Sequence, residues 1–297
     1  MQKKNRLFIF SFLAIPLAMY TVFFIVPFIT AFYYSFTRWS GISRNAVFVG
    51  LQNFMTLFND PKVWEAFTHN VKFITITFLP VFILSILFAN LLVRAKLKHF
   101  ESRIYRVLVF TPNVLSIVII CLVWSFIYNP SSIGVLNNLL TAIGLENLTR
   151  DWLGNAATVI PSIAVVQIWT YTGFYIVLFI AAIKRIPEEI YEAATIDGAN
   201  VVSQFFGITL PLIWGIIRIS MIFFAINGFK NNFAYVNILT NGGPNGQSQV
   251  LETLMYNKAF LENNFGYATA IGFITFAITF IVQGVINLAT KKEEYEL

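Results

Sequence analysis

The sequence predicts an all-α membrane protein with about six transmembrane helices. Of its 297 residues, 57% are hydrophobic and only 11% are charged, whereas soluble domains carry about 25% charged and about 45–50% apolar residues. A transmembrane helix needs about 20 mostly apolar residues, and six runs meet this requirement. We expect them to form a single transmembrane domain over residues 1–297, with spans at about 7–32, 73–92, 107–127, 159–183, 212–236 and 267–289.

The first and fifth runs differ from simple spans. The first follows the basic sequence MQKKNR, as the apolar core of a signal peptide would. It is longer than such a core, and the following FYYSFTRW is a poor cleavage site, so we expect an uncleaved first span. The fifth run is the least regular, because Arg218 and the sequence NGFKNN (227–232) interrupt it.

The basic residues predict the direction of the spans. Lys and Arg in short segments beside spans are typical of the cytoplasmic side. Four short segments are rich in them, whereas the longer connections 37–72, 128–157 and 227–266 hold few. We therefore expect both termini and the connection 184–211 to be cytoplasmic. The basic residues concerned are Lys3, Lys4, Arg6, Arg94, Lys96, Lys98, Arg103, Arg106, Lys184, Arg185, Lys291 and Lys292.

Several classes of function are disfavoured by what the sequence lacks. The net charge of +6 is dispersed, with no basic stripe for nucleic acid. No G-x-x-x-x-G-K-[ST] stretch is present, so ATP hydrolysis is not expected on this chain. His69 and His99 are too few and too far apart for a metal site or a catalytic triad. Cys121 lacks a disulfide partner and is expected to be a small buried hydrophobe. We predict no catalytic residue and no metal site.

The segment 184–211, here called the acidic loop, is unusual for a connection between spans. Good helix formers follow Pro187, Gly198 breaks the chain, and a second apolar pattern runs to Pro211. This predicts two short helices. One interpretation is an amphipathic connector on the membrane surface. Such connectors are commonly basic because the inner leaflet is negative, so acidity favours docking of a protein with basic residues. The acidic residues are Glu188, Glu189, Glu192 and Asp197.

The same loop resembles a signature of a known transport family. The stretch EAATIDGANVVSQFFGITLP (192–211) resembles the EAA signature in permease subunits of binding-protein-dependent ABC importers, particularly those of the carbohydrate-uptake branch. Segments 48–70 and 239–251 resemble outer loops of sugar permeases, so the resemblance covers nearly the whole chain. The matching positions of the signature are Glu192, Ala193, Ala194, Asp197, Gly198, Ala199, Phe205, Ile208, Leu210 and Pro211.

The resemblance implies a type I ABC importer permease fold in a prokaryotic plasma (inner) membrane. It also implies cytoplasmic coupling helices that enter a cleft in an ATP-hydrolysing subunit. The implied partners are a second permease subunit, two ATP-binding subunits, an extracellular or periplasmic solute-binding protein, a sugar substrate and membrane lipid. ATP and Mg would be bound by the partner subunits, with no cofactor on this chain. The implied ATPase-coupling residues are Glu192, Ala193, Ala194, Asp197, Gly198, Ala199, Ile208, Leu210 and Pro211.

The fourth run carries polar and aromatic residues that suit a sugar. An amide, a hydroxyl and aromatic rings at i, i+3, i+4 and i+7 share one helix face. They could equally pack this helix against another span. In maltose-type permeases, which this chain resembles, sugar contacts come from this face and from the fifth span. The residues at the corresponding positions are Gln167, Thr170, Tyr171, Phe174, Ala225, Gly228 and Phe229. Most of these side chains differ from those of the family, so the identity of the sugar does not transfer.

Two other functions of a membrane domain are less consistent with the spans. A membrane-embedded enzyme needs clustered ionisable residues inside spans, and Arg218 is the only one well inside an apolar run. An ion-driven secondary transporter or channel is the alternative function. The spans lack the Asp/Glu relay that proton or sodium coupling would need, and the acidic loop would then have no explanation.

Overall fold

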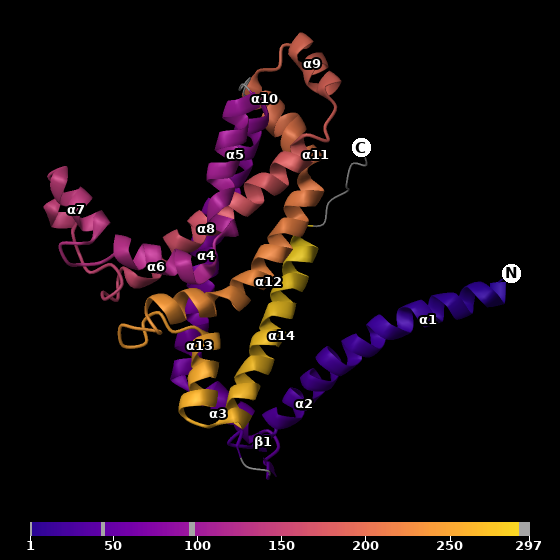
Figure 1. The fold of residues 1–297 in the computed structure, drawn as a ribbon, viewed down its shortest axis with the longest axis vertical. Helices are drawn as coiled ribbons and strands as arrows, with labels where there is room; N and C mark the ends of the chain where they lie inside the picture. The colour runs from indigo at the N-terminus through magenta and orange to yellow at the C-terminus, as the bar shows by residue number, and fades with distance from the viewer. Residues whose placement is uncertain (1, 43–44, 95–98, 291–297) are drawn as a thin grey trace. The chain divides into compact units, whose positions relative to one another are not determined.

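A computed structural model describes residues 2–42, 45–94 and 99–290, without the side chains of 2–9, 99–103, 106 and 108 (Figure 1). The regular secondary structure of the described chain is helical apart from one two-stranded antiparallel ribbon, which confirms the all-α prediction. Some basic residues used above to predict orientation lie outside the described residues or side chains. These are Lys3, Lys4, Arg6, Lys96, Lys98, Arg103, Arg106, Lys291 and Lys292.

The chain divides into two structural units. The first comprises Met1–Trp64 and Leu254–Ala277, and the second comprises Glu65–Thr253 and Ile278–Leu297. In chain order the elements are α1 (Gln2–Tyr20), π-helix η1 (Thr21–Ile25), α2 (Val26–Ser35), β1 (Thr37–Arg38), β2 (Val47–Phe48), α3 (Gln52–Asn59), α4 (Pro61–Arg94), α5 (His99–Val114), α6 (Ile117–Ile127), α7 (Val135–Ala142), 3₁₀-helix η2 (Glu146–Leu148), α8 (Val159–Ile183), α9 (Glu188–Ile196), α10 (Val201–Gln204), π-helix η3 (Phe205–Thr209), α11 (Leu210–Leu212), α12 (Trp214–Leu239), α13 (Leu251–Tyr256), π-helix η4 (Asn257–Leu261) and α14 (Phe265–Ala289).

Aromatic side chains hold the first unit together. Phe28 of α2 meets Phe276 of α14 edge to face, with ring centroids 5.3 Å apart. One turn further along α2, the ring of Phe32 lies 4.7 Å from that of Phe273. Because aromatic pairs in this distance range attract each other beyond their burial, they fix α2 against the first part of α14.

Four helices of the described chain are long and apolar enough to cross a membrane. They overlap the expected first, second, fourth and sixth spans. The expected fifth span belongs to a pair of helices, Val201–Leu212 and Trp214–Leu239, which are bent by 67° at their junction. The four continuous helices are Phe10–Ser35, Pro61–Arg94, Val159–Ile183 and Phe265–Ala289.

The third apolar run, 107–127, forms two helices instead of one continuous helix. α5 starts at His99, within the segment expected to connect spans, and ends at Val114, while α6 starts at Ile117. Pro112 near the end of α5 has no N–H for the helical ladder. Ser116 is extended, with φ −59° and ψ 137°. The interruption places Asn113 in the final turn of a helix instead of mid-span.

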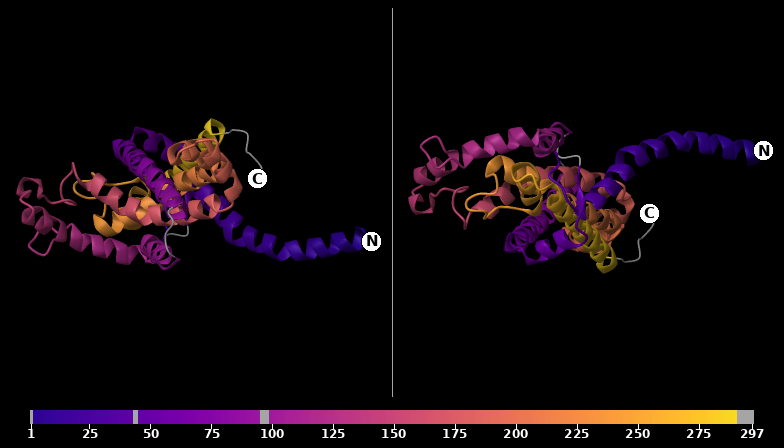
Figure 2. Two further views of the ribbon diagram at one scale, coloured as in Figure 1. Left: turned by 90° about the horizontal axis from the view of Figure 1, so that it is seen from above. Right: turned by 90° about the horizontal axis from the view of Figure 1, so that it is seen from below.

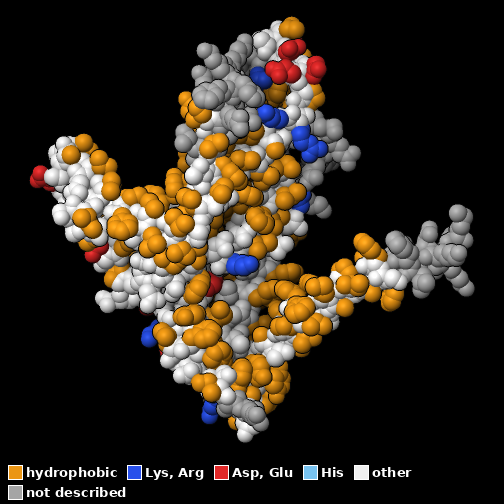
Figure 3. Space-filling model, viewed as in Figure 1, with side chains coloured by type: hydrophobic (Ala, Val, Ile, Leu, Met, Phe, Trp, Pro, Cys, Tyr) orange, Lys and Arg blue, Asp and Glu red, His pale blue; other side chains and the backbone are white. Residues whose placement is uncertain are grey.

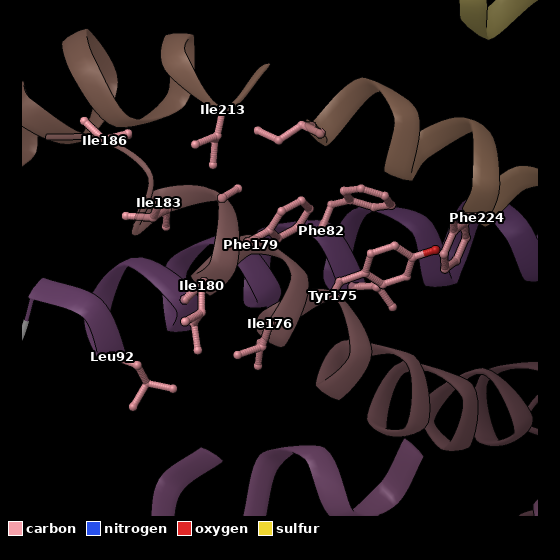
Figure 4. Packing of buried hydrophobic residues seen from close by; sticks show 14 of the residues in the cluster. Phe82, Leu92, Tyr175, Ile176, Phe179, Ile180, Ile183, Ile186, Ile213 and Phe224 are labelled. Carbon is pink, nitrogen blue, oxygen red and sulfur yellow. The ribbon is translucent and has the colours of Figure 1, made fainter. Parts of the chain in front are cut away.

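The core of the second unit lies where α4, α8 and α12 meet (Figure 4). The ring of Phe82 lies 5.1 Å from that of Tyr175 and 5.7 Å from that of Phe224. A second cluster surrounds Cys121, which is fully buried. The expectation that this cysteine is a buried hydrophobe is therefore confirmed.

Helix α5 runs alongside α8 (Figures 1 and 2). Gly173 of α8 permits this approach, because a Cβ there would lie 2.2 Å from the carbonyl oxygen of Val109 in α5.

We expect Gly173→Ala to lower the free energy of unfolding by about 1–3 kcal/mol through overpacking, measured as a lower Tm of the protein in detergent. Gly284→Ala is the matched control, since a Cβ there meets nothing within 4 Å. Equal Tm values for the two variants would contradict close α5–α8 packing.

Candidate functional site

Two short helices form the acidic loop, as the sequence predicted. α9 follows Pro187, and Glu188 and Glu189 occupy its first turn, where carboxylates complement the helix dipole. α10 starts after Asn200, whose side chain accepts a hydrogen bond from the N–H of Ser203 at 2.9 Å. This is an N-cap interaction. Local sequence signals therefore account for both helix starts.

The turn between α9 and α10 depends on Gly198. Its φ is +83°, a left-handed conformation that side chains disfavour. The N–H of Gly198 donates to the carbonyl of Thr195 at 3.1 Å, and the N–H of Ala199 donates to that of Ala194 at 2.8 Å. This pair of bonds is a Schellman motif. The glycine of the signature is thus needed to end α9 sharply.

The signature residues divide into an exposed part and a part packed on the core. Figure 3 shows acidic side chains gathered at the end of the second unit that carries α9. Ile208 and Leu210 pack against the core cluster of α4, α8 and α12. The residues of the loop that pack on the core therefore support an acidic surface that faces solvent. The exposed members are Glu192, Ala193, Asp197 and Gly198, while Ala194, Ala199, Phe205 and Pro211 are half-buried.

Large apolar side chains share this exposed surface, and sequence reasoning missed them. Ile196 is 87% exposed, and Val201, Val202 and Phe206 are each about two-thirds exposed. Apolar patches rimmed by polar groups mark interaction sites. The available signal was the presence of β-branched residues on both sides of Gly198. The acidic loop thus combines carboxylates with an apolar surface suited to protein docking.

An aromatic pocket of about 250 Å³ opens between α5, α8 and α12. Phe174 and Tyr175 of α8 meet edge to face, with centroids 5.1 Å apart. Tyr175 and Phe224, both labelled in Figure 4, lie on facing helices with centroids 6.0 Å apart. Phe223 of α12 also lines the pocket and lies 6.2 Å from Phe174. The walls are therefore mostly aromatic rings.

Polar groups reach this pocket from three helices. Asn113 comes from α5, Tyr171 from α8, and Asn227 and Asn231 from α12. The Asn227 side chain donates to the carbonyl of Phe223 at 2.9 Å. The Tyr171 hydroxyl is buried, and within the described chain no hydrogen bond of ordinary geometry reaches it. Leaving a buried donor unpaired costs about 1–3 kcal/mol. This hydroxyl is suited to bond a polar group of a ligand.

Three of the expected pathway residues line the aromatic pocket: Tyr171, Phe174 and Gly228. Gly228 is closely packed, because a Cβ there would lie 3.1 Å from Ile74. Sequence reasoning missed Asn113, since a single amide in an apolar run carries little signal. Its position just after Pro112 was the only available indication.

The other four expected pathway residues do not line this pocket. The Gln167 amide is buried and donates to Asn232 Oδ1 at 2.9 Å, which joins α8 to α12. Thr170 is buried and donates to a carbonyl within α8. Ala225 and Phe229 are buried within the second unit. These four residues therefore pack α8 and α12 against their neighbours, which is the alternative to sugar contact that the sequence left open.

The half-buried carboxyl of Glu252 joins α4 to the start of α13. The Asn70 side chain donates to Glu252 Oε2 at 3.1 Å and accepts from the N–H of Leu251 at 2.8 Å. His69 Nδ1 lies 2.9 Å from the carbonyl oxygen of Gln249. Burial raises the pKa of Glu252 from its ordinary 4.5 to about 7, and the Asn70 amide only partly offsets this.

This raised pKa predicts a pH-dependent stability. The folded state holds the Glu252 proton more tightly than the unfolded state, so the free energy of unfolding falls as pH rises from about 4.5 to about 7. Glu252→Gln keeps an acceptor for Asn70 and removes this titration. We expect the Tm of Glu252→Gln to equal that of the wild type near pH 4.5 and to exceed it increasingly up to pH 7–8. Parallel Tm profiles for the two proteins would contradict this assignment.

Comparison with known protein families shows which family the chain belongs to. Residues 73–294 match the family of binding-protein-dependent transport system inner membrane components. The chain belongs to this family. It is a multi-pass permease of the ABC importer type, as the signature of the acidic loop implied.

The permease has relatives along nearly its whole length. It is 37% identical over 283 residues to the probable ABC transporter permease YurN of Bacillus subtilis, covering 94% of each chain. It is 34% identical over 294 residues to the diacetylchitobiose uptake permease NgcF of Streptomyces coelicolor, covering 96% of this chain and 82% of the relative. It is 33% identical over 291 residues to the multiple sugar-binding transport permease MsmF of Streptococcus mutans, covering 98% and 97%.

The fold of the permease matches a solved importer. A chain in the crystal structure of a bacterial ABC transporter involved in alginate import superposes with a TM-score of 0.84 at 22% identity. The match covers 97% of the permease and 96% of that chain. The expected type I permease fold is thereby confirmed. Among the described residues of the permease, no three His, Cys, Asp or Glu side chains are arranged to hold a metal ion.

Proposed function

We propose that this permease is the transmembrane subunit of an ATP-driven carbohydrate importer and forms half of the translocation pathway. The aromatic pocket is the observation that carries this proposal. Aromatic rings offer flat apolar faces to the C–H groups of a sugar, and the amides and the Tyr171 hydroxyl bond its hydroxyls. Relatives named for the uptake of diacetylchitobiose and of multiple sugars support an oligosaccharide substrate.

The acidic loop is the site at which ATP hydrolysis is coupled to transport. Its exposed carboxylates and apolar side chains favour a protein partner that presents basic residues around an apolar cleft. That partner is one of two ATP-binding subunits, which hold ATP and Mg. The loop and both termini lie in the cytoplasm. The coupling residues are Glu192, Ala193, Ala194, Asp197, Gly198, Ala199, Ile208, Leu210 and Pro211.

A transport cycle follows from these two sites. A solute-binding protein delivers sugar from the outer side to the interface between this chain and a second permease. Closure of the ATP-binding subunits displaces the acidic loop, and the helices packed on it switch the pocket from inward to outward access. Hydrolysis then reverses the change. Tyr171, Phe174 and Gly228 contact the sugar, while Gln167, Thr170, Ala225 and Phe229 hold α8 and α12 in place around it.

Reconstitution in liposomes tests the function. The permease is co-expressed with its second permease and ATPase subunit, and the binding protein is added with a panel of labelled oligosaccharides. We expect one class of sugar to stimulate ATP hydrolysis and to accumulate only when ATP is present. Accumulation driven by a proton or sodium gradient without ATP would favour the ion-driven alternative instead.

A further inference from the structure

The acidic loop is attached to a helix far from it in sequence, at Arg94. This residue is the last of α4, and its Nη2 donates to Gln204 Oε1 of α10 at 2.7 Å. Its guanidinium carbon also lies 3.8 Å from the centre of the Tyr191 ring of α9. A planar cation on an aromatic face is a favourable contact. One side chain of α4 therefore contacts both helices of the acidic loop.

The contact of Arg94 with α9 and α10 is here called the Arg94 junction. Both the oxygen and the nitrogen of the Gln204 side-chain amide form hydrogen bonds in it. Its Oε1 accepts from Arg94, while its Nε2 donates to Thr195 Oγ1 at 2.9 Å and to the carbonyl of Ala199 at 3.1 Å. The side chain is 5% exposed. Gln204 thus links α4, the end of α9 and the Gly198 turn at once.

Tyr191 anchors the other side of the junction. Its ring is buried in the core cluster, and its hydroxyl lies 2.9 Å from Thr209 Oγ1, which is also buried. This ties α9 to the π-helical segment before α11. Moving the acidic loop away from Arg94 would break these bonds, and the buried Gln204 side chain would then lose its partners.

Helix α4 leads from this junction to the aromatic pocket. Twelve residues before Arg94, at about 1.5 Å per residue or about 18 Å, Phe82 packs on Tyr175 and Phe224 of the pocket wall (Figure 4). Between them, Ser85 Oγ donates to the carbonyl of Thr172 at 3.1 Å. The stretch from Phe82 to Arg94 is a continuous helix without proline, so a displacement at one end is transmitted to the other.

We propose that Arg94 is the positioning residue through which the acidic loop moves α4 and, with it, the aromatic wall of the pocket. This inference rests on the proposed function, since it describes how ATP-driven motion reaches the sugar. The direct peptide connections run through α8 and α12. The Arg94 junction adds a third connection, through a span that the sequence places far from the loop.

The test uses the complete transporter in liposomes, with uptake and ATP hydrolysis measured together. We expect Arg94→Gln and Gln204→Ala each to lower the sugar moved per ATP at least threefold, while the ATPase subunit still co-purifies at wild-type levels. The double variant should lose no more than the worse single variant, because both break one connection. Arg185→Gln, an exposed arginine at the other end of the loop, is the matched control and should transport normally.

Hydrogen–deuterium exchange gives a readout that does not require transport. In Arg94→Gln, amides of α9 and α10 should exchange at least severalfold faster than in the wild type or in Arg185→Gln. Unchanged exchange, an unchanged ratio of sugar to ATP, or losses that multiply in the double variant would each overturn the role of Arg94. A wild-type complex that takes up sugar without ATP would instead overturn the proposed function, while the exchange result still decides whether Arg94 holds the loop.

Discussion

Glu192→Lys is expected to reduce ATP-driven uptake at least tenfold without unfolding the protein. Glu192 is exposed on α9, in the surface that also carries Asp197 and the apolar side chain of Ile196. Reversing its charge places a cation against the basic partner surface that we propose, and like charges across an interface cost several kcal/mol. Since about 1.4 kcal/mol is a factor of ten in affinity, docking of the ATPase subunit should be largely lost.

Three measurements separate this effect from general damage. The Tm of Glu192→Lys in detergent should stay close to that of the wild type, because exposed substitutions usually change stability by less than about 0.5 kcal/mol. Co-purification of the ATPase subunit should fall, and in the wild type it should weaken with added salt. Glu146→Lys reverses an exposed acid in another connection and should leave docking unchanged. Wild-type uptake by Glu192→Lys would rule out docking through this carboxylate.

The acidic loop could be predicted well because its structure is decided locally. The end of α9 follows from a glycine that adopts φ +83° and from hydrogen bonds between residues no more than five apart. Apolar runs likewise predict spans from length and composition alone. The division of the third run into α5 and α6 could not be read in this way. A proline within an apolar run is tolerated in some membrane helices and interrupts others, depending on which neighbours satisfy the freed backbone groups.

The candidate pathway shows where helix periodicity stops being informative. The spacing of Gln167, Tyr171 and Phe174 correctly indicates a common side of α8, but not what each residue meets along it. Gln167 meets Asn232 and bonds it, whereas Tyr171 and Phe174 meet an opening toward α5 and α12. Those partners lie on helices far away in sequence, so their depth and register come only from the packed structure.

Tyr171→Phe is expected to have opposite effects on stability and on transport. The Tyr171 hydroxyl is buried at the pocket without a hydrogen bond of ordinary geometry in the described chain. Removing it should leave the Tm of the sugar-free protein unchanged or higher, because an unpaired buried group no longer has to be desolvated. If the hydroxyl bonds the sugar, the KM for uptake should rise up to about tenfold, the equivalent of about 1.4 kcal/mol.

Tyr128→Phe provides the matched control with the reverse pattern. The Tyr128 hydroxyl is also buried, but it donates to the carbonyl of Ser162 at 3.0 Å. Its removal loses a buried hydrogen bond that the folded protein makes, so the Tm should fall while the KM for uptake stays the same. A structural role for Tyr171 would make the two variants behave alike. The proposed sugar contact is therefore rejected if Tyr171→Phe lowers the Tm and leaves the KM unchanged. A raised KM at an undiminished Tm is the result expected when the partner of the hydroxyl is the transported molecule.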